Sequence, residues 1–185
     1  MKNNKIIISF VLSMVLSVFV YGEGYLSLSA NALFSSDSGY KDVYGSTIIY
    51  PEIEAGYKIY KDMFIFGGFG FFSKEGKTTG ELQINTKSAQ NILSFGVGYD
   101  FNLNEKIDIL IRAGIARIGY KEEAMEQEVK GNKIGILLGS DLVYKFGERF
   151  FTKATIGYMS AKDTIEGVDI KLGGFKVGIG VGLRF

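Results

Sequence analysis

The chain has no cysteine, no histidine and no tryptophan, and it has a single proline in 185 residues. The lack of cysteine excludes both a disulfide framework and a thiolate metal site. The lack of histidine removes the commonest general base and the commonest zinc ligand. The formal net charge of +1 gives no basic surface for nucleic acid, so no nucleic-acid partner is expected. The composition therefore points to no cofactor and no metal.

Glycine and aromatic residues are what the chain has in excess. It contains 25 glycines, 11 tyrosines and 15 phenylalanines, with acidic and basic residues almost balanced. An aromatic, glycine-rich and proline-poor composition with mixed charge indicates β-sheet rather than disorder. The length suits one domain.

Residues 1–22 have the pattern of a secretory signal peptide. Lys2 and Lys5 precede an apolar run from Ile6 to Tyr21, and small residues lie before Glu23. The alternative is an uncleaved anchor, but the run is shorter than the ~20 residues that a spanning helix needs. No later run reaches ~18 apolar residues, so residues 23–185 could enter a membrane only as a closed barrel.

The last stretch of the chain, Leu172 to Phe185, alternates from Gly174 onward. From there one parity is apolar, and the other is glycine apart from Lys176 and Arg184. A period of two is that of a β-strand. The stretch resembles the closing strand of a bacterial outer-membrane β-barrel, in which a terminal phenylalanine is the usual assembly signal. The resemblance assigns that role to Phe185 and implies recognition of this strand by the barrel assembly machinery.

Eight segments alternate in this way, and the connections between them are short and long in turn. Transmembrane barrels show short turns on one side and longer loops of roughly a dozen residues on the other. Charged runs at 121–131 and 161–171 are predicted as two of these loops. Pro51 is expected at a bulge or near a rim, because it cannot donate to a ladder. The predicted strands are 24–34, 47–60, 63–73, 82–101, 107–120, 133–146, 150–160 and 172–185.

The cost of charge in lipid decides which parity faces outward. A lysine or arginine facing lipid at the midplane costs ~2–4 kcal/mol, and in each segment one parity is free of mid-strand charge. Only the strand at 63–73 is ambiguous, and Ile65, Phe69 and Phe71 are expected to face outward. Aromatic residues are expected to form girdles at both strand ends. The inward parity carries an expected ion network of Glu52, Glu54, Lys58, Asp100, Asp108, Arg112, Asp141, Lys145, Lys153, Lys176 and Arg184.

The sequence thus predicts an all-β, eight-stranded, antiparallel up-and-down transmembrane barrel with a polar, charge-paired interior. Its pattern resembles the small outer-membrane barrels of the OmpA/OmpX type. The resemblance implies a place in the bacterial outer membrane, in contact with its lipid and lipopolysaccharide. Some relatives modify lipid A through a histidine-dependent site, which this chain cannot copy. Arg112 is expected to bridge Glu52 and Glu54 across the lumen.

Two acidic groups leave alternatives open. Glu52 and Glu54 lie two apart on one face and suit either an acid–base pair or lumen ion pairing, of which ion pairing is favoured. One acidic run could supply oxygen ligands for calcium, although a solvated acidic loop is the favoured interpretation. The run comprises Glu122, Glu123, Glu126 and Glu128. No catalytic, cofactor-binding or metal-binding residue is assigned.

The favoured function is a non-enzymatic barrel that supports the outer membrane and presents four surface loops to an extracellular partner, as in adhesion. A small-solute pore is the first alternative, although eight strands leave an interior that side chains about fill. A secreted soluble carrier of a ligand is the second.

The signal-peptide interpretation predicts a mature protein that starts near Glu23. Mass spectrometry of the protein isolated from its native membrane should give a mass without residues 1–22, with the uncleaved precursor as the reference. A mass that retains these residues would indicate an uncleaved anchor instead.

Overall fold

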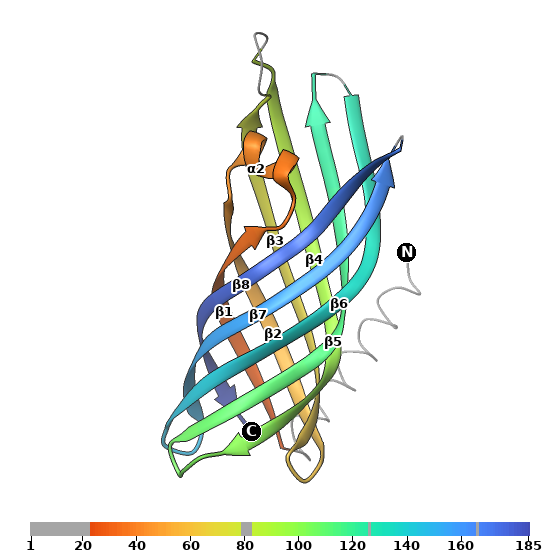
Figure 1. Cartoon of the computed structure of the whole chain (residues 1–185). Helices are drawn as coiled ribbons and strands as arrows, with labels where there is room; N and C mark the ends of the chain where they lie inside the picture. Colours follow the sequence, from red (N-terminus) through yellow and green to blue (C-terminus); the bar gives the residue numbers. More distant parts are fainter. Residues whose placement is uncertain (1–22, 79–82, 126, 166) are drawn as a thin grey trace, which may run out of the picture.

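The computed structural model describes residues 23–185 except 79–82, 126 and 166, so the predicted signal peptide lies outside the described residues. Eight antiparallel strands follow one another around a closed barrel, as predicted (Figure 1). One short helix, α2, lies between the first two strands. The elements are β1 (Gly24–Ser35), α2 (Ser38–Tyr44), β2 (Thr47–Tyr60), β3 (Met63–Lys77), β4 (Asn85–Asn102), β5 (Ile107–Ala124), β6 (Gln127–Phe146), β7 (Phe150–Ile165) and β8 (Val168–Arg184).

Pairing of the first and last strands closes the barrel. The ladder between β1 and β8 runs from Tyr25 opposite Arg184 to Ser35 opposite Gly174. Beyond it the Gly24 amide donates to the Phe185 carbonyl at 2.8 Å, and the Phe185 amide donates to the Gly24 carbonyl at 3.0 Å. The carboxyl-terminal residue is thus part of the closing seam, because its backbone continues the ladder to the turn-side rim.

Two of the predicted loops are wrong, because the strands continue through them. The β5–β6 ladder reaches Ala124 opposite Gln127, and the β7–β8 ladder reaches Ile165 opposite Val168. The backbone ladder defines the β5–β6 extension, and an exposed ion pair that contributes little to stability accompanies it, with Lys121 Nζ 2.9 Å from Glu128 on the facing strand. The two charged runs are therefore the ends of extended hairpins rather than irregular loops.

The first long connection contains α2, which the sequence analysis did not predict. Asp37 caps the helix, since its Oδ1 accepts a hydrogen bond from the Tyr40 amide at 2.8 Å. The other Asp37 oxygen accepts from the Lys171 amide at 2.9 Å. The cap thereby ties the start of the helix to the β7–β8 hairpin. No helix among the described residues is long and apolar enough to cross a membrane.

Pro51 lies at the end of a ladder and not at a bulge. It pairs with Ala30 in regular register on the β1 side, and the β2–β3 ladder begins one residue later, at Glu52 opposite Gly70. Its missing N–H therefore costs no hydrogen bond with β3. The irregularity in β2 falls between Lys58 and Tyr60 instead.

The strand with ambiguous parity faces as predicted. Phe69 and Phe71 are 44% and 56% exposed on the outer wall, and Ile65 is half-buried. Phe64 and Phe66 are only 5% and 2% exposed and lie inside. The outward choice follows the neighbouring strands, because β3 pairs with β2 and β4 without a shift at these positions.

Aromatic side chains gather at both ends of the outer wall. On the turn side, Tyr99 and Phe101 have ring centroids 4.6 Å apart, and Tyr144 and Phe146 have centroids 4.9 Å apart. On the loop side, the exposed rings of Phe34 and Phe175 have centroids 6.3 Å apart. Tyrosine and phenylalanine at these levels match the interfaces of a bilayer.

The inward face is more apolar than expected, because bulky side chains lie on both sides of the charged residues. Glycine makes room for some of them: a side chain at Gly98 would collide with the Phe64 ring, and one at Gly182 would collide with the Phe151 ring. The apolar cluster of the interior includes Leu33, Ile48, Tyr50, Phe64, Phe66, Phe72, Ile92, Leu110, Ile118, Tyr120, Leu137, Val143, Phe151, Met159 and Leu172.

We predict that deleting Phe185 lowers the yield of folded protein in the outer membrane more than it lowers the stability of the assembled barrel. The deletion removes two backbone hydrogen bonds at the rim of the closing seam, together with the predicted assembly signal. Yield is measured as the heat-modifiable band in membrane fractions.

Phe146→Ala is the matched control, because Phe146 is an exposed rim aromatic on β6 that takes no part in the β1–β8 closing seam. This variant should assemble at the parental level. An unchanged yield in the Phe185 deletion would reject the assembly role.

Candidate functional site

The barrel interior holds a central ion cluster made by four strands. Arg112 from β5 donates through Nη1 to Glu54 on β2, and its Nη2 lies 2.9 Å from Asp141 Oδ1 on β6. Lys153 from β7 lies 2.9 Å from Glu54 Oε1 and 3.9 Å from Asp141 Oδ2. All four side chains are at most 4% exposed. The two acids and two bases balance, and the Arg112–Glu54 contact joins strands that are not neighbours.

A second pair lies beside the central cluster. Lys176 from β8 places Nζ 2.7 Å from Glu52 Oε2, which also accepts a hydrogen bond from the Asn31 amide group at 2.9 Å. Both charged side chains are at least nine-tenths buried. The two charges cancel, so neither remains unpaired in the interior, where an unpaired charge would be costly.

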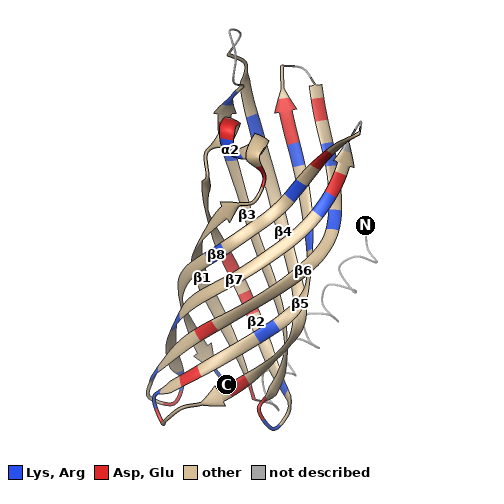
Figure 2. Ribbon diagram, in the orientation of Figure 1, with Lys and Arg blue, Asp and Glu red and all other residues tan. Residues whose placement is uncertain are grey.

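A third group lies toward the turn side. Asp108 is fully buried and accepts from Lys145 Nζ at 2.8 Å and from Arg184 Nη2 at 2.6 Å. Arg184 also lies 3.8 Å from Asp100. Figure 2 shows the charged residues on the strands of the turn-side half and again on the hairpins at the other end. The group therefore balances two acids against two bases.

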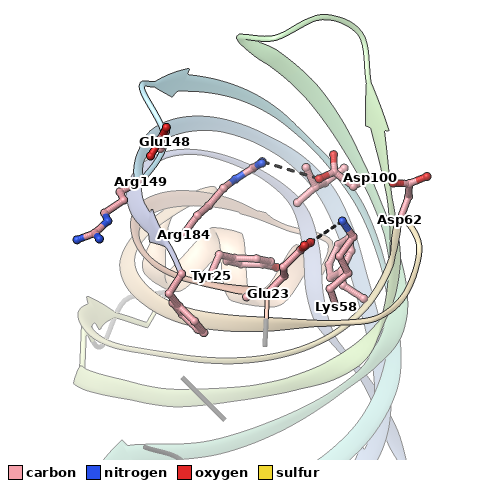
Figure 3. A pocket seen from close by; sticks show the side chains of 12 residues that line it. Glu23, Tyr25, Lys58, Asp62, Asp100, Glu148, Arg149 and Arg184 are labelled. Atoms are coloured by element: carbon pink, nitrogen blue, oxygen red, sulfur yellow. Dashed lines mark hydrogen bonds and ion pairs between the residues drawn. The ribbon is translucent and has the colours of Figure 1, made fainter. Parts of the chain in front are cut away.

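The turn-side mouth is a pocket of about 450 Å³ (Figure 3). Lys58, the remaining member of the predicted network, points there toward Glu23, with Nζ 2.7 Å from Oε2. Both side chains are well exposed, so this pair contributes little to stability. The structure therefore places ten of the predicted residues in three interior groups and Lys58 at the rim.

The expected bridge from Arg112 to both strand-two carboxylates does not form. Arg112 engages Glu54 and Asp141, whereas Glu52 engages Lys176. Residues two apart on a strand share a face but lie at different heights, and the neighbours at each height come from different strands. Both carboxylates are held by bases, an arrangement that suits ion pairing better than proton transfer.

Several partners of the network went unpredicted because they carry no charge. Tyr25 donates to Glu54 at 3.1 Å, and Thr155 donates to Asp141 at 2.7 Å. Asn31 has the inward parity of β1 and donates to Glu52 at 2.9 Å. The inward parity itself was the available signal for all three.

The acidic run considered for calcium does not converge. Glu122 turns inward, where Tyr44 donates to it, while Glu123 and Glu128 both contact Lys121 on the outer side. Glu126 lies outside the described residues. No cluster of three ligating side chains suited to a metal occurs among the residues that the structure describes.

The charge network predicts that Arg112→Ala destabilises the barrel by ~3–5 kcal/mol, because Glu54 and Asp141 would each lose a buried partner. The measurement is the urea midpoint of the refolded barrel in lipid vesicles. Single-channel recording should also find no steady wide-pore conductance in the parent.

Arg117→Ala is the matched control, since Arg117 is exposed and forms no ion pair within the described part of the chain, only a 3.4 Å hydrogen bond to Asn132. It should leave the midpoint unchanged. Lys176→Met alone should lower the free energy of unfolding more than the double variant Lys176→Met with Glu52→Gln. The single change leaves Glu52 charged and unpaired, whereas the double variant removes both charges. An Arg112 variant as stable as the parent, or an openly conducting parent, would contradict the network's role.

Comparisons with known proteins agree with this architecture. The family described as "Outer membrane protein beta-barrel domain" matches residues 9–185. No curated protein sequence matches the chain. OprG, an outer membrane protein of Pseudomonas aeruginosa, is similar in structure with a TM-score of 0.73 at 11% identity, over 89% of this chain and 96% of OprG.

Two further solved barrels are similar over 89% of this chain and 99% of their own. Neisserial surface protein A has a TM-score of 0.61 at 15% identity. Ail, the attachment invasion locus protein of Yersinia pestis, solved with the heparin analogue sucrose octasulfate, has a TM-score of 0.60 at 18% identity. These identities establish the fold alone. With the match over residues 9–185, they show that this chain belongs to the outer membrane protein beta-barrel domain family of the bacterial outer membrane.

Proposed function

We propose that the protein is a non-enzymatic, closed barrel that supports the outer membrane and presents its surface hairpins to an extracellular partner. The observation that carries the proposal is the filled, charge-neutral interior. Three balanced ion groups lie among bulky apolar side chains, and the pockets at the two ends share no lining residue. An interior filled in this way favours the role of a structural scaffold over that of a pore.

The surface that we propose for interaction lies at the end of the barrel opposite the carboxyl terminus. Two hairpins, β5–β6 and β7–β8, extend there beyond their shared ladder, which ends at Ile136 opposite Ser160 (Figure 1). Ail, whose name records attachment and invasion, supports an adhesive role for a barrel of this shape. The partner we propose is therefore bound by the hairpin tips.

The remaining partners follow from the place in the membrane. The apolar outer wall contacts lipid, and the exposed Arg117 and Lys130 suit the anionic groups of lipopolysaccharide. The barrel assembly machinery would recognise the strand that ends at Phe185. Residues 1–22 would direct export and then be removed.

The experiment shortens each hairpin without disturbing the barrel. Replacing residues 121–130 by Asn-Gly keeps Tyr120 opposite Gly131, and replacing 162–171 by Asn-Gly keeps Ala161 opposite Leu172. Asn-Gly forms the tight turn that a two-residue hairpin loop requires. Both variants should fold, because the ladders below the cuts stay complete.

Cells displaying the parent should bind to at least one surface in an array of matrix proteins and glycans, heparin included. One or both shortened variants should lose that binding while keeping a heat-modifiable barrel. Cells with an empty vector provide the background. Parental binding no higher than this background, or binding kept by both variants, would contradict the proposed surface role.

A further inference from the structure

A cavity of about 670 Å³ at the hairpin end of the barrel is lined by residues of α2, β5, β6 and β8. We call it the extracellular vestibule. Leu33, Ile48 and Leu172 line it and are 2–4% exposed, and no residue of the three interior ion groups lines it. Val129 and Ile170 extend the apolar lining toward the hairpins. The vestibule therefore has mostly apolar walls and is separate from the ion groups, which suits a small-molecule site.

The vestibule has a way in from water. The β6–β7 ladder starts at Ile136 opposite Ser160, so β6 residues 127–135 have no ladder partner on β7. The lining includes residues from β6 and from β8, which lie on the two hairpins that separate there (Figure 1). A ligand could thus enter between the hairpins, above the level of the membrane, without crossing the barrel interior.

The charge of the lining is mainly negative. Four carboxylate residues and one lysine, Lys171, line the vestibule. Three of these carboxylates already have partners, because Asp37 caps α2, Glu123 contacts Lys121, and the last pairs with Lys162. Glu122 differs from them, since it makes no ion pair within the described part of the chain.

Glu122 is held in place by a neutral donor. Tyr44 donates its hydroxyl to Glu122 Oε2 at 2.5 Å, which joins α2 to β5. Burial raises the pKa of the Glu122 carboxyl, and the nearby hydroxyls of Ser88 and Tyr44 counter this only in part. Glu122 is half-buried, and a partly desolvated carboxylate without a cation would gain free energy on binding one.

Further polar groups beside Glu122 are not fully used. Thr86 is 8% exposed and lines the vestibule, and Ser88 is completely buried one residue pair further in. The hydroxyls of both make no hydrogen bond of standard geometry within the described residues. Both hydroxyls face polar neighbours, Thr86 toward Tyr44 and Ser88 toward Glu122, but neither contact is well formed, so a ligand could improve on them.

We infer that the vestibule binds a small organic ammonium ion, with the cationic head at Glu122 and its alkyl groups against the apolar wall. An inorganic cation such as Ca²⁺ would need six to eight oxygen ligands, which these walls do not provide. An anion would meet the negative lining. Tyrosine rings, Tyr40 and Tyr120 among them, also line the cavity and suit an alkylammonium ion better than its neutral isostere.

The test uses choline and its neutral isostere, 3,3-dimethylbutan-1-ol, with the complete folded barrel in uncharged maltoside micelles. Choline carries the cationic head, and the alcohol has the same shape without the charge. Calorimetry or saturation-transfer NMR should show choline binding at least about tenfold more tightly, the scale of one partly desolvated cation contact. Equal affinities, or no binding of choline, would overturn the inference.

Variants locate the site. Glu122→Gln should weaken choline binding by about tenfold, which corresponds to the loss of one charge contact. Glu128→Gln removes the same charge from the same hairpin but on its outer face, where Glu128 contacts Lys121 and Lys130, so it should bind choline normally. Tyr44→Phe should keep binding, because it frees Glu122 and retains the ring.

Each variant is first checked for a heat-modifiable barrel. Glu122→Gln with unchanged affinity would overturn the inference, and so would equal losses in Glu122→Gln and Glu128→Gln. The comparison of choline with its isostere on the parent protein tests the inference even if a variant fails to fold.

Discussion

Closure of the backbone ladder is the constraint on which the rest of this structure depends. Lipid offers no water to unpaired N–H and C=O groups, so a sheet can cross a membrane only if its first and last strands pair. Here β1 and β8 pair along their shared length, and Phe185 continues that pairing to Gly24. The barrel's one proline, Pro51, is compatible with this closure, because it lies just before the start of the β2–β3 ladder.

Closure also determines what the interior must contain. Once the apolar parity faces lipid, the other parity is confined to a narrow space in which unpaired charges are costly. The charges therefore occur in neutral groups, with Arg112 between Glu54 and Asp141 and with Lys176 on Glu52. Bulky apolar residues fill the remaining height. An eight-stranded barrel packed in this way serves as a scaffold rather than as a channel.

Outside the membrane the constraint is relaxed, and the chain uses this freedom. Hairpins β5–β6 and β7–β8 separate above Ile136 and Ser160, and two glycines with positive φ, Gly173 and Gly174, lie where β8 leaves β1. Positive φ is readily adopted by glycine alone. The separated hairpins and α2 enclose the extracellular vestibule, the part of the molecule where a recognition function is compatible with a sealed barrel.

The sequence by itself determined the eight-stranded barrel, its outward face and the inward position of the charged residues. Each of these follows from local period-two alternation and from the cost of charge in lipid. The tertiary structure alone decided that Asp141, and not Glu52, is the second partner of Arg112. Strand tilt and stagger, which no local pattern encodes, determine which inward residues meet. It likewise decided that the run around Lys121 is a hairpin, because that depends on the β5–β6 backbone ladder, which continues to Ala124 opposite Gln127.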